Sequence, residues 1–246
     1  MDEPTPAPDS AHGAPARTIY RHRVATRLWH WINAITIFIM IGSGLMIFNA
    51  HPHLYWGNYG ANFDHPWLSL PRWPGWLTIP STYNLALSRR WHMLFALLLG
   101  FGLLAFMATS LINRHFQRDL RVRADELKPR SLLHDLKEHL AFRFHDPANP
   151  AAFNIFQKLS YVLVIFVLIP LMIFTGLTMS PGMDAAWPWL LDIFGGRQSA
   201  RSIHFIAAAG LVAFIIVHLA LVILADPWNE VRSMITGRWT VPKEDS

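Results

Sequence analysis

The sequence of 246 residues contains no cysteine and only 15% charged residues. The absence of cysteine excludes disulfides, thiolate-bound iron–sulfur clusters, covalently attached c-type haem and zinc–thiolate sites. Soluble domains carry about 25% charged residues, so the shortage of charge argues against a soluble enzyme. The net charge of +5 does not indicate nucleic-acid binding, because the basic residues lie beside apolar runs, where membrane topology explains them.

Asp, Glu, Lys and Arg are missing from four long apolar runs, which cover residues 28–48, 91–112, 159–179 and 203–225. About 20 residues of helix cross the hydrocarbon core of a bilayer, and no run shows the alternation of a barrel strand. We therefore predict an all-α membrane protein, a four-helix transmembrane bundle over residues 18–240. Residues 1–17, rich in Pro and Ala, are expected to be a disordered tail, and 241–246 form a short C-terminal tail.

Lys and Arg are distributed unequally between the two sides of the predicted bundle. Sixteen lie before the first run, between the second and third, or after the fourth, whereas loops 49–90 and 180–202 hold only five. The positive-inside rule then places both termini in the cytoplasm and these two loops outside. Loop 49–90 is rich in aromatic residues, which favours either an interfacial belt at the membrane surface or a docking platform for an external partner.

Four histidines lie inside the apolar runs: His30, His92, His204 and His218. A polar group at membrane depth is costly unless it is paired or coordinated, although a lone one is often only a hydrogen-bonded packing residue. His204 and His218 are 14 residues apart, which places them on one helix face with about 21 Å between them along the axis. In an antiparallel bundle His92 meets His204 on the outer side and His30 meets His218 on the inner side, provided that the first helix begins earlier, near Arg23, or is tilted.

Two histidine pairs stacked along a bundle are what two bis-imidazole haems need, with the haems between the helices. Gly44 and Gly176 lie in the first and third spans, where a flat macrocycle needs positions without a Cβ, although small residues also serve helix packing. Haem propionates require cations, and Arg27 flanks the inner pair while Arg90 and Arg201 flank the outer pair. The alternative reading is a transporter or assembly subunit whose histidines bind a transition metal or relay protons.

These residues resemble the bacterial cytochrome b561 and nickel-hydrogenase b-type cytochrome family over about residues 18–240. The resemblance rests on the segments RLWHWIN at 27–33 and RWH at 90–92, on the spacing of His204 and His218, and on the glycines in SGLMI and TGLTMSP. The segment YWGNYG at 55–60 is most similar to the branch of thiosulfate reductase cytochrome b subunits.

The resemblance implies a membrane cytochrome with two haems b that moves electrons between a partner enzyme and a quinone in the bacterial inner membrane. His30 and His218 would bind the iron of the cytoplasmic-side haem, and His92 and His204 that of the periplasmic-side haem. A periplasmic oxidoreductase, of the molybdopterin type in this branch, would dock on loops 49–90 and 180–202. A hydrogenase cytochrome b subunit, and a stand-alone cytochrome that oxidises superoxide and reduces quinone, stay open as alternatives; whether the chain is itself an enzyme stays open with them.

Overall fold

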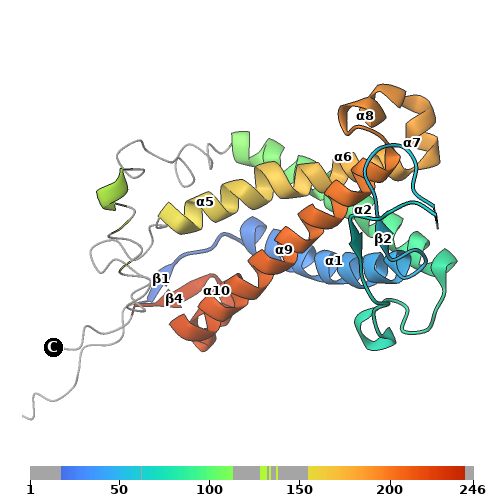
Figure 1. The fold of residues 1–246 in the computed structure, drawn as a ribbon. Coiled ribbons are helices and arrows are strands. Elements are labelled where there is room, and N and C mark those ends of the chain that lie inside the picture. Colours follow the sequence, from blue (N-terminus) through green and yellow to red (C-terminus); the bar gives the residue numbers. More distant parts are fainter. Residues whose placement is uncertain are drawn as a thin grey trace, which may run out of the picture.

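The computed structural model describes residues 18–61, 63–112, 128–131, 133, 137 and 155–241. The predicted disordered tail 1–17 lies outside these residues, as does nearly all of the predicted C-terminal tail. The described chain is an all-helical bundle with a small two-stranded sheet near each end (Figure 1). The four spans were predicted from composition, but the two sheets were not.

Four helices are long and apolar enough to cross a membrane. They are α1 (Val24–Phe48), α2 (Leu85–Ile112), the continuous helix Ile155–Met179, and α9 (Arg197–Ala225). Each ends where its apolar run ends but begins four to six residues earlier. The early turns carry charged residues, whose long side chains reach the polar interface while the backbone stays helical. Because α1 begins at Val24, His30 lies almost two turns inside the helix, as its predicted pairing with His218 requires.

The third span changes its helical winding in the middle. α5 (Ile155–Leu163) is followed by a π-helical turn, η2 (Val164–Leu168), and then by α6 (Ile169–Met179). Pro170 has no backbone N–H and its ring cannot accommodate the preceding turn of a regular α-helix, so wider winding before a proline relieves the conflict. The span therefore continues through the proline without exposing its backbone.

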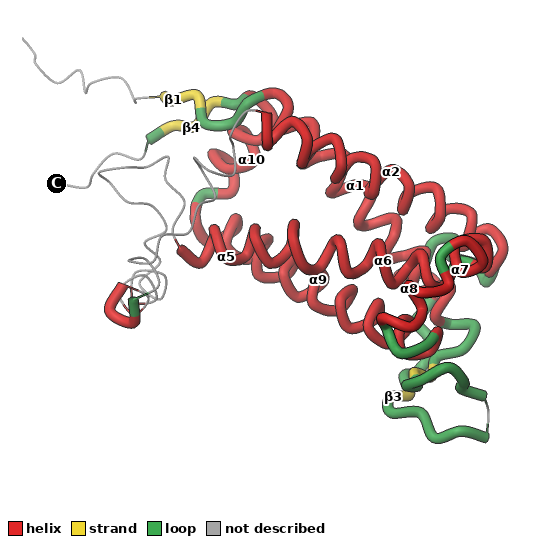
Figure 2. Tube along the Cα trace, turned by 90° about the horizontal axis from the view of Figure 1, so that it is seen from above, coloured by secondary structure: helices red, strands yellow, loops and turns green. Residues whose placement is uncertain are grey.

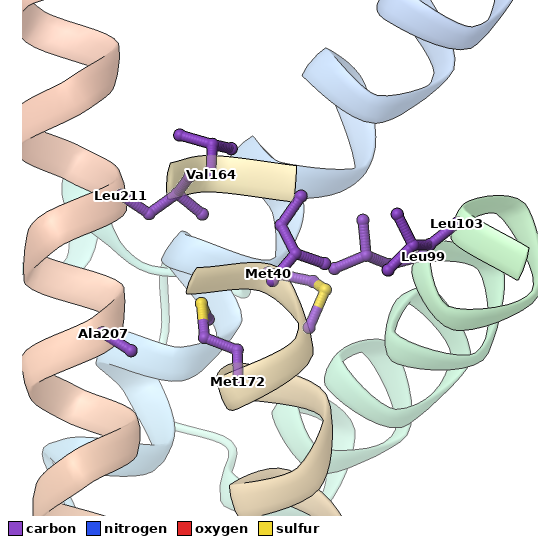
Figure 3. Close-up of a cluster of buried hydrophobic side chains, with 8 residues drawn as sticks. Met40, Leu99, Leu103, Val164, Met172, Ala207 and Leu211 are labelled. Atoms are coloured by element: carbon purple, nitrogen blue, oxygen red, sulfur yellow. The ribbon is translucent and has the colours of Figure 1, made fainter. Parts of the chain in front are cut away.

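The helices pack as two pairs, α1 with α2 and α6 with α9, and Figure 2 shows the pairs side by side along the bundle. A buried cluster joins all four spans through Met40 of α1, Leu99 and Leu103 of α2, Met172 of α6, and Ala207 and Leu211 of α9, together with Val164 and Ile169 (Figure 3). In the most apolar stretch of each span, at most 33% of the residues are buried within the chain, which leaves the rest partly or fully exposed, as apolar side chains are in lipid.

One end of the bundle is closed by the two ends of the described chain. β1 (Thr18–Tyr20) pairs antiparallel with β4 (Arg238–Thr240), and Ile19 lies opposite Trp239. Between α9 and β4, the amphipathic helix α10 (Pro227–Thr236) starts at Asp226, whose carboxylate accepts the backbone N–H of Asn229 at 3.2 Å. Trp239 is only 1% exposed, so this strand pair is anchored by a buried ring.

The other end is covered by the two loops predicted to face outward. Residues 49–84 contain the hairpin of β2 (His53–Leu54) and β3 (Leu68–Ser69) and the short helix η1 (Gly75–Leu77). Residues 180–196 contain α7 (Pro181–Ala186) and α8 (Pro188–Ile193). Figure 1 shows β2, α7 and α8 gathered at the end of the bundle opposite β1 and β4.

Candidate functional site

The four histidines of the spans come together as two pairs at two depths of the bundle. The rings of His92 on α2 and His204 on α9 have their centres 6.3 Å apart. The rings of His30 on α1 and His218 on α9 have the same separation, 6.3 Å. Because α9 supplies one member of each pair, its 14-residue spacing sets the distance between the two sites at about 21 Å along the helix axis.

Both separations fit a single metal ion between two imidazoles better than direct contact between the rings. An imidazole nitrogen binds a metal at about 2.0 Å, and adding the distance from that nitrogen to its ring centre on both sides gives a total of about 6 Å. The planes of the two rings in each pair make angles of 61° and 59°, so the rings are not stacked on each other. Among the described residues there is no cluster of three or more His, Cys, Asp or Glu that could hold a metal ion.

In the outer pair, the second nitrogen of each imidazole meets a buried hydroxyl. Ser43 Oγ lies 3.1 Å from His92 Nδ1, and Thr175 Oγ1 lies 3.0 Å from His204 Nδ1. Both hydroxyls also donate to the carbonyl four residues earlier on their own helix, Ser43 to Ile39 at 2.7 Å and Thr175 to Leu171 at 2.6 Å. Since the hydroxyl proton is used there, Nδ1–H is the donor to the hydroxyl and Nε2 remains as the nitrogen that can bind a metal.

The glycine that follows each hydroxyl packs against the same imidazole. A Cβ at Gly44 would lie 3.4 Å from Cε1 of His92, and a Cβ at Gly176 would lie 3.6 Å from Cε1 of His204. The other glycines of the first two spans have different neighbours: Gly42 packs against Ile79 and Gly102 against Trp29. The two glycines predicted for the site are therefore those that border the outer histidine pair.

The inner pair has a different environment. Nδ1 of His30 is buried and has no hydrogen-bond partner within the described part of the chain. The rings of Trp31 and His30 make a T-shaped contact with 5.2 Å between their centres, and Phe214 stacks on His218 at 5.8 Å. The inner imidazoles are thus bordered by aromatic rings, whereas the outer imidazoles are bordered by hydroxyls.

Comparison with known proteins identifies the family. Residues 21–237 match the prokaryotic cytochrome b561 family, a region that contains both histidine pairs. The chain belongs to this family. Membership makes it a membrane b-type cytochrome with four spans, and it implies that the chain binds b-type haem, for which the paired imidazoles are suitable ligands.

Several curated relatives cover most of the chain. A protein named as a protein-methionine-sulfoxide reductase subunit, YedZ1, from Azospira oryzae is 26% identical over 80% of this chain and 87% of its own length. Proteins named as Ni/Fe-hydrogenase B-type cytochrome subunits from Azotobacter vinelandii and Cupriavidus necator are 24% and 22% identical. Each alignment covers 92% of this chain, and 90% and 89% of the relative. No solved structure gives a significant match.

The three arginines predicted to serve propionates in this b-type cytochrome lie in different surroundings. Arg201 donates to the carbonyl of His53 at 3.0 Å and also to that of His51, so its guanidinium already holds the outer loop. Arg27 donates to the carbonyl of Ile235, while its Nε is buried with no partner among the described residues. Arg90 is exposed at the start of α2. Burial, Arg201 and His53 together lower the pKa of His51, which keeps that loop imidazole neutral beside the arginine.

The outer loop is fastened directly to the first turns of α9. The carbonyl of Gly57 accepts the backbone N–H groups of Gln198 and Ser199 at 3.0 and 3.2 Å, and the Gly57 N–H donates to Ser199 Oγ at 2.7 Å. These bonds satisfy groups that a helix N-terminus leaves free. The loop therefore fixes the end of the helix that carries His204, two turns from the outer pair.

Sequence reasoning missed Ser43 and Thr175. Their signal is present in the sequence, because each hydroxyl directly precedes the glycine singled out there, in SGL at 43–45 and TGL at 175–177. Serine and threonine in a membrane helix usually bond only to their own backbone, so the pattern by itself does not reveal the imidazole partner.

Proposed function

We propose that the chain is a di-haem b-type cytochrome in which His30 and His218 bind the inner haem iron and His92 and His204 bind the outer one. The observation that carries this proposal is the presence of two imidazole pairs, each with 6.3 Å between ring centres, at two depths of one bundle. Bound haem would supply one-electron chemistry, and the paired imidazoles would hold its iron.

The protein's contribution is to hold both sites in one rigid path across the membrane. The buried cluster of Met40, Met172 and Leu211 lies between the histidine pairs and fills the centre of the bundle with apolar side chains. Such packing excludes water between the two sites and keeps the helices at a fixed spacing. The distribution of Lys and Arg supports an orientation with both termini in the cytoplasm and the His92–His204 pair on the outer side.

An external oxidoreductase is the proposed partner, docking on loops 49–90 and 180–202. The outer loop presents exposed aromatic side chains, with Tyr59 at 87%, Phe63 at 98% and Trp76 at 80% exposure. The matched relatives are named as subunits of a hydrogenase and of a methionine-sulfoxide reductase, which supports an oxidoreductase as the partner class. The YWGNYG segment favours a periplasmic molybdopterin enzyme of the thiosulfate reductase type, and a hydrogenase is the second candidate.

A quinone is the proposed electron partner at the inner end. A cavity of about 510 Å³ lies between the start of α1 and the end of α10, lined by Val24, Arg27, Leu28, Trp31, Met234 and Ile235. It is predominantly apolar, as a quinone ring requires, and one of its lining residues, Arg27, carries hydrogen-bond donors. Trp31 connects this cavity to the inner pair because its ring and the His30 ring make a T-shaped contact.

The alternative of a stand-alone cytochrome that oxidises superoxide and reduces quinone has weaker support than an electron-transfer subunit with an enzyme partner. An anion would be attracted by free outer arginines, but Arg201 is bonded to loop carbonyls and Arg197 forms an ion pair with Asp184 at 2.5 Å. Of the five arginines in the two outer loops, Arg72, Arg89 and Arg90 lie exposed. Reduction of the haem by superoxide, with no partner present, would favour this alternative.

The test is the haem content of purified protein after haem-replete expression. The wild-type chain is expected to bind two haems b per polypeptide with a reducible spectrum, whereas His204→Ala and His30→Ala are each expected to retain one. A colourless preparation would contradict the proposal, and so would two haems retained in either variant. Exposed His65, on the outer loop, provides the matched control substitution His65→Ala, for which two haems are expected.

A further inference from the structure

We propose that Ser43 and Thr175 are positioning residues that give the outer haem the lower reduction potential of the two. The inference rests on the proposed function, because it requires that His92 and His204 bind the outer haem iron. It adds what that function leaves open, which is the order of the two potentials and hence the favoured direction of electron flow.

The first observation is that the same local arrangement occurs twice around the outer pair. On α1 and again on α6, a fully buried hydroxyl lies about 3 Å from Nδ1 of a histidine on the partner helix, and a glycine follows it in the sequence. The two helix pairs, α1 with α2 and α6 with α9, therefore each supply the outer site with one imidazole and one hydroxyl.

The direction of these hydrogen bonds follows from where the hydroxyl protons go. Ser43 Oγ has two backbone acceptors within reach, the carbonyls of Ile39 at 2.7 Å and Met40 at 3.2 Å. Thr175 Oγ1 likewise reaches the carbonyls of Leu171 and Met172, at 2.6 and 3.3 Å. A hydroxyl has a single proton, so its remaining capacity toward the imidazole is as an acceptor from Nδ1–H.

The consequence for an axial ligand is greater basicity. An acceptor for the outer N–H of a metal-bound imidazole fixes its tautomer and raises its electron donation to the metal. The hydroxyl is itself polarised by its bond to the helix carbonyl, which strengthens the bond to the imidazole. A more strongly donating ligand stabilises Fe(III) more than Fe(II), so the potential of the outer haem is lowered.

The second observation is the contrast at the inner pair. Nδ1 of His30 is buried with no hydrogen-bond partner among the described residues, so the hydroxyl support found at the outer pair is not built at this imidazole. Taking up one electron converts Fe(III) to Fe(II) at either haem; both imidazoles stay bound and Nδ1 keeps its proton. With potentials in this order, an electron would pass downhill from the outer haem to the inner one, and a quinone at the inner end would be the oxidant that removes it.

The experiment is an equilibrium redox titration of the purified holoprotein, followed by optical and ferric electron paramagnetic resonance spectra. In the wild type, the component that is absent from His204→Ala is expected to be the lower-potential one. Ser43→Ala and Thr175→Val are expected to raise the potential of this component while both haems remain bound. A tenfold change of its reduction equilibrium corresponds to about 59 mV for one electron.

Rescue and control variants separate a positioning role from simple packing. Ser43→Thr and Thr175→Ser keep a hydroxyl and are expected to restore the wild-type potential. Ser88→Ala is the control. The Ser88 hydroxyl is also fully buried, lies one turn before His92 and donates to the carbonyl of Asn84 at 2.7 Å. No shift of the outer haem potential is expected in this variant.

Three results would overturn the proposal. They are an outer potential unchanged in both hydroxyl variants, equal shifts of both haems, or an outer haem of higher potential than the inner one in the wild type. The last comparison needs only the wild type and His204→Ala, so it tests the proposed order of the two potentials even if a hydroxyl variant fails to bind haem. Failure of the proposed function is distinct, because it would be seen beforehand as a haem content other than two.

Discussion

Trp67 of the outer loop donates its indole N–H to Ser202 on α9, with 3.0 Å between Nε1 and Oγ. Ser202 is fully buried, and its hydroxyl donates a hydrogen bond to the carbonyl of Tyr55 at 2.6 Å. The loop and the helix that carries His204 are thus connected by a short chain of hydrogen bonds across 135 residues of sequence. This chain should make the stability of the outer site depend on the loop.

Trp67→Phe tests this dependence because it keeps an aromatic ring beside Trp56 and removes only the N–H donor. We expect a loss of about 1 kcal/mol in the free energy of unfolding, together with faster hydrogen exchange in the loop, measured by mass spectrometry in detergent micelles. Trp76→Phe is the control, since that ring is 80% exposed. Equal exchange rates in the two variants would show that the Trp67–Ser202 bond does not hold the loop.

Two glycines on α2 are expected to respond to alanine in opposite directions. A Cβ at Gly102 would lie 2.5 Å from Trp29, whose ring is stacked on Phe106 and has little room to move. Gly102→Ala is therefore expected to destabilise the protein by about 1–3 kcal/mol through overpacking. A Cβ at Gly100 would meet nothing within 4 Å, so Gly100→Ala is expected to stabilise it by up to about 1 kcal/mol through helix propensity. Thermal unfolding of the purified variants measures both, and shifts of the same sign would contradict this packing argument.

Glu230 on α10 holds the strand pair at the inner end. One carboxylate oxygen accepts Trp239 Nε1 at 3.0 Å and Arg21 Nη1 at 3.4 Å, and the Arg21 guanidinium lies over the Trp239 ring. Glu230→Gln removes the charge from this largely buried group and is expected to cost about 2 kcal/mol and to speed amide exchange in β1 and β4. The control is Asp184→Asn, which breaks the more exposed pair with Arg197 and should cost about 1 kcal/mol or less.

His22 should make the protein sensitive to acid. Burial, followed by the positive charge of Arg21, lowers the pKa of His22 from 6.5 to about 4, although Glu230 opposes the shift. Between these two pH values the unfolded chain binds the proton and the folded chain does not, so the contribution of His22 to stability is complete above pH 6.5 and is lost as the pH falls toward 4.

His22→Gln is expected to flatten this part of the curve of melting temperature against pH. The measurement is thermal unfolding in detergent at several pH values, with the exposed His65→Gln as the control. A His22→Gln curve as steep as that of the wild type would show that the neutral His22 does not contribute.

The membrane spans and the histidine pairs were predictable because both follow from local features of the sequence, namely runs without charge and the spacing of residues along one helix. A run without charge fixes a helix in the membrane, and the 14-residue step from His204 to His218 fixes their common face whatever the rest of the chain does. The helix starts were less predictable, since residues such as Arg27 and Arg201 interrupt the apolar pattern but not the helix.

The hydroxyl partners and the strand pair could not be read from the sequence because each depends on a contact between distant segments. Ser43 and His92 are 49 residues apart, and Thr18 and Thr240 lie near opposite ends of the chain. A strand of three residues has no measurable alternation, so only its partner identifies it. Arg201 shows the same limit, since its sequence position suits a propionate while its guanidinium is already bonded to loop carbonyls.

The double use of α9 has a consequence for biogenesis. Since this last span contributes one imidazole to each pair, a nascent chain that has inserted only its first three spans has neither pair. Binding of haem by a histidine pair must then wait until translation has passed residue 218. Strand β4, which follows α9 and α10, can pair with β1 only after that point. Under the proposed function, both sites therefore become complete only late, when the last span has been inserted.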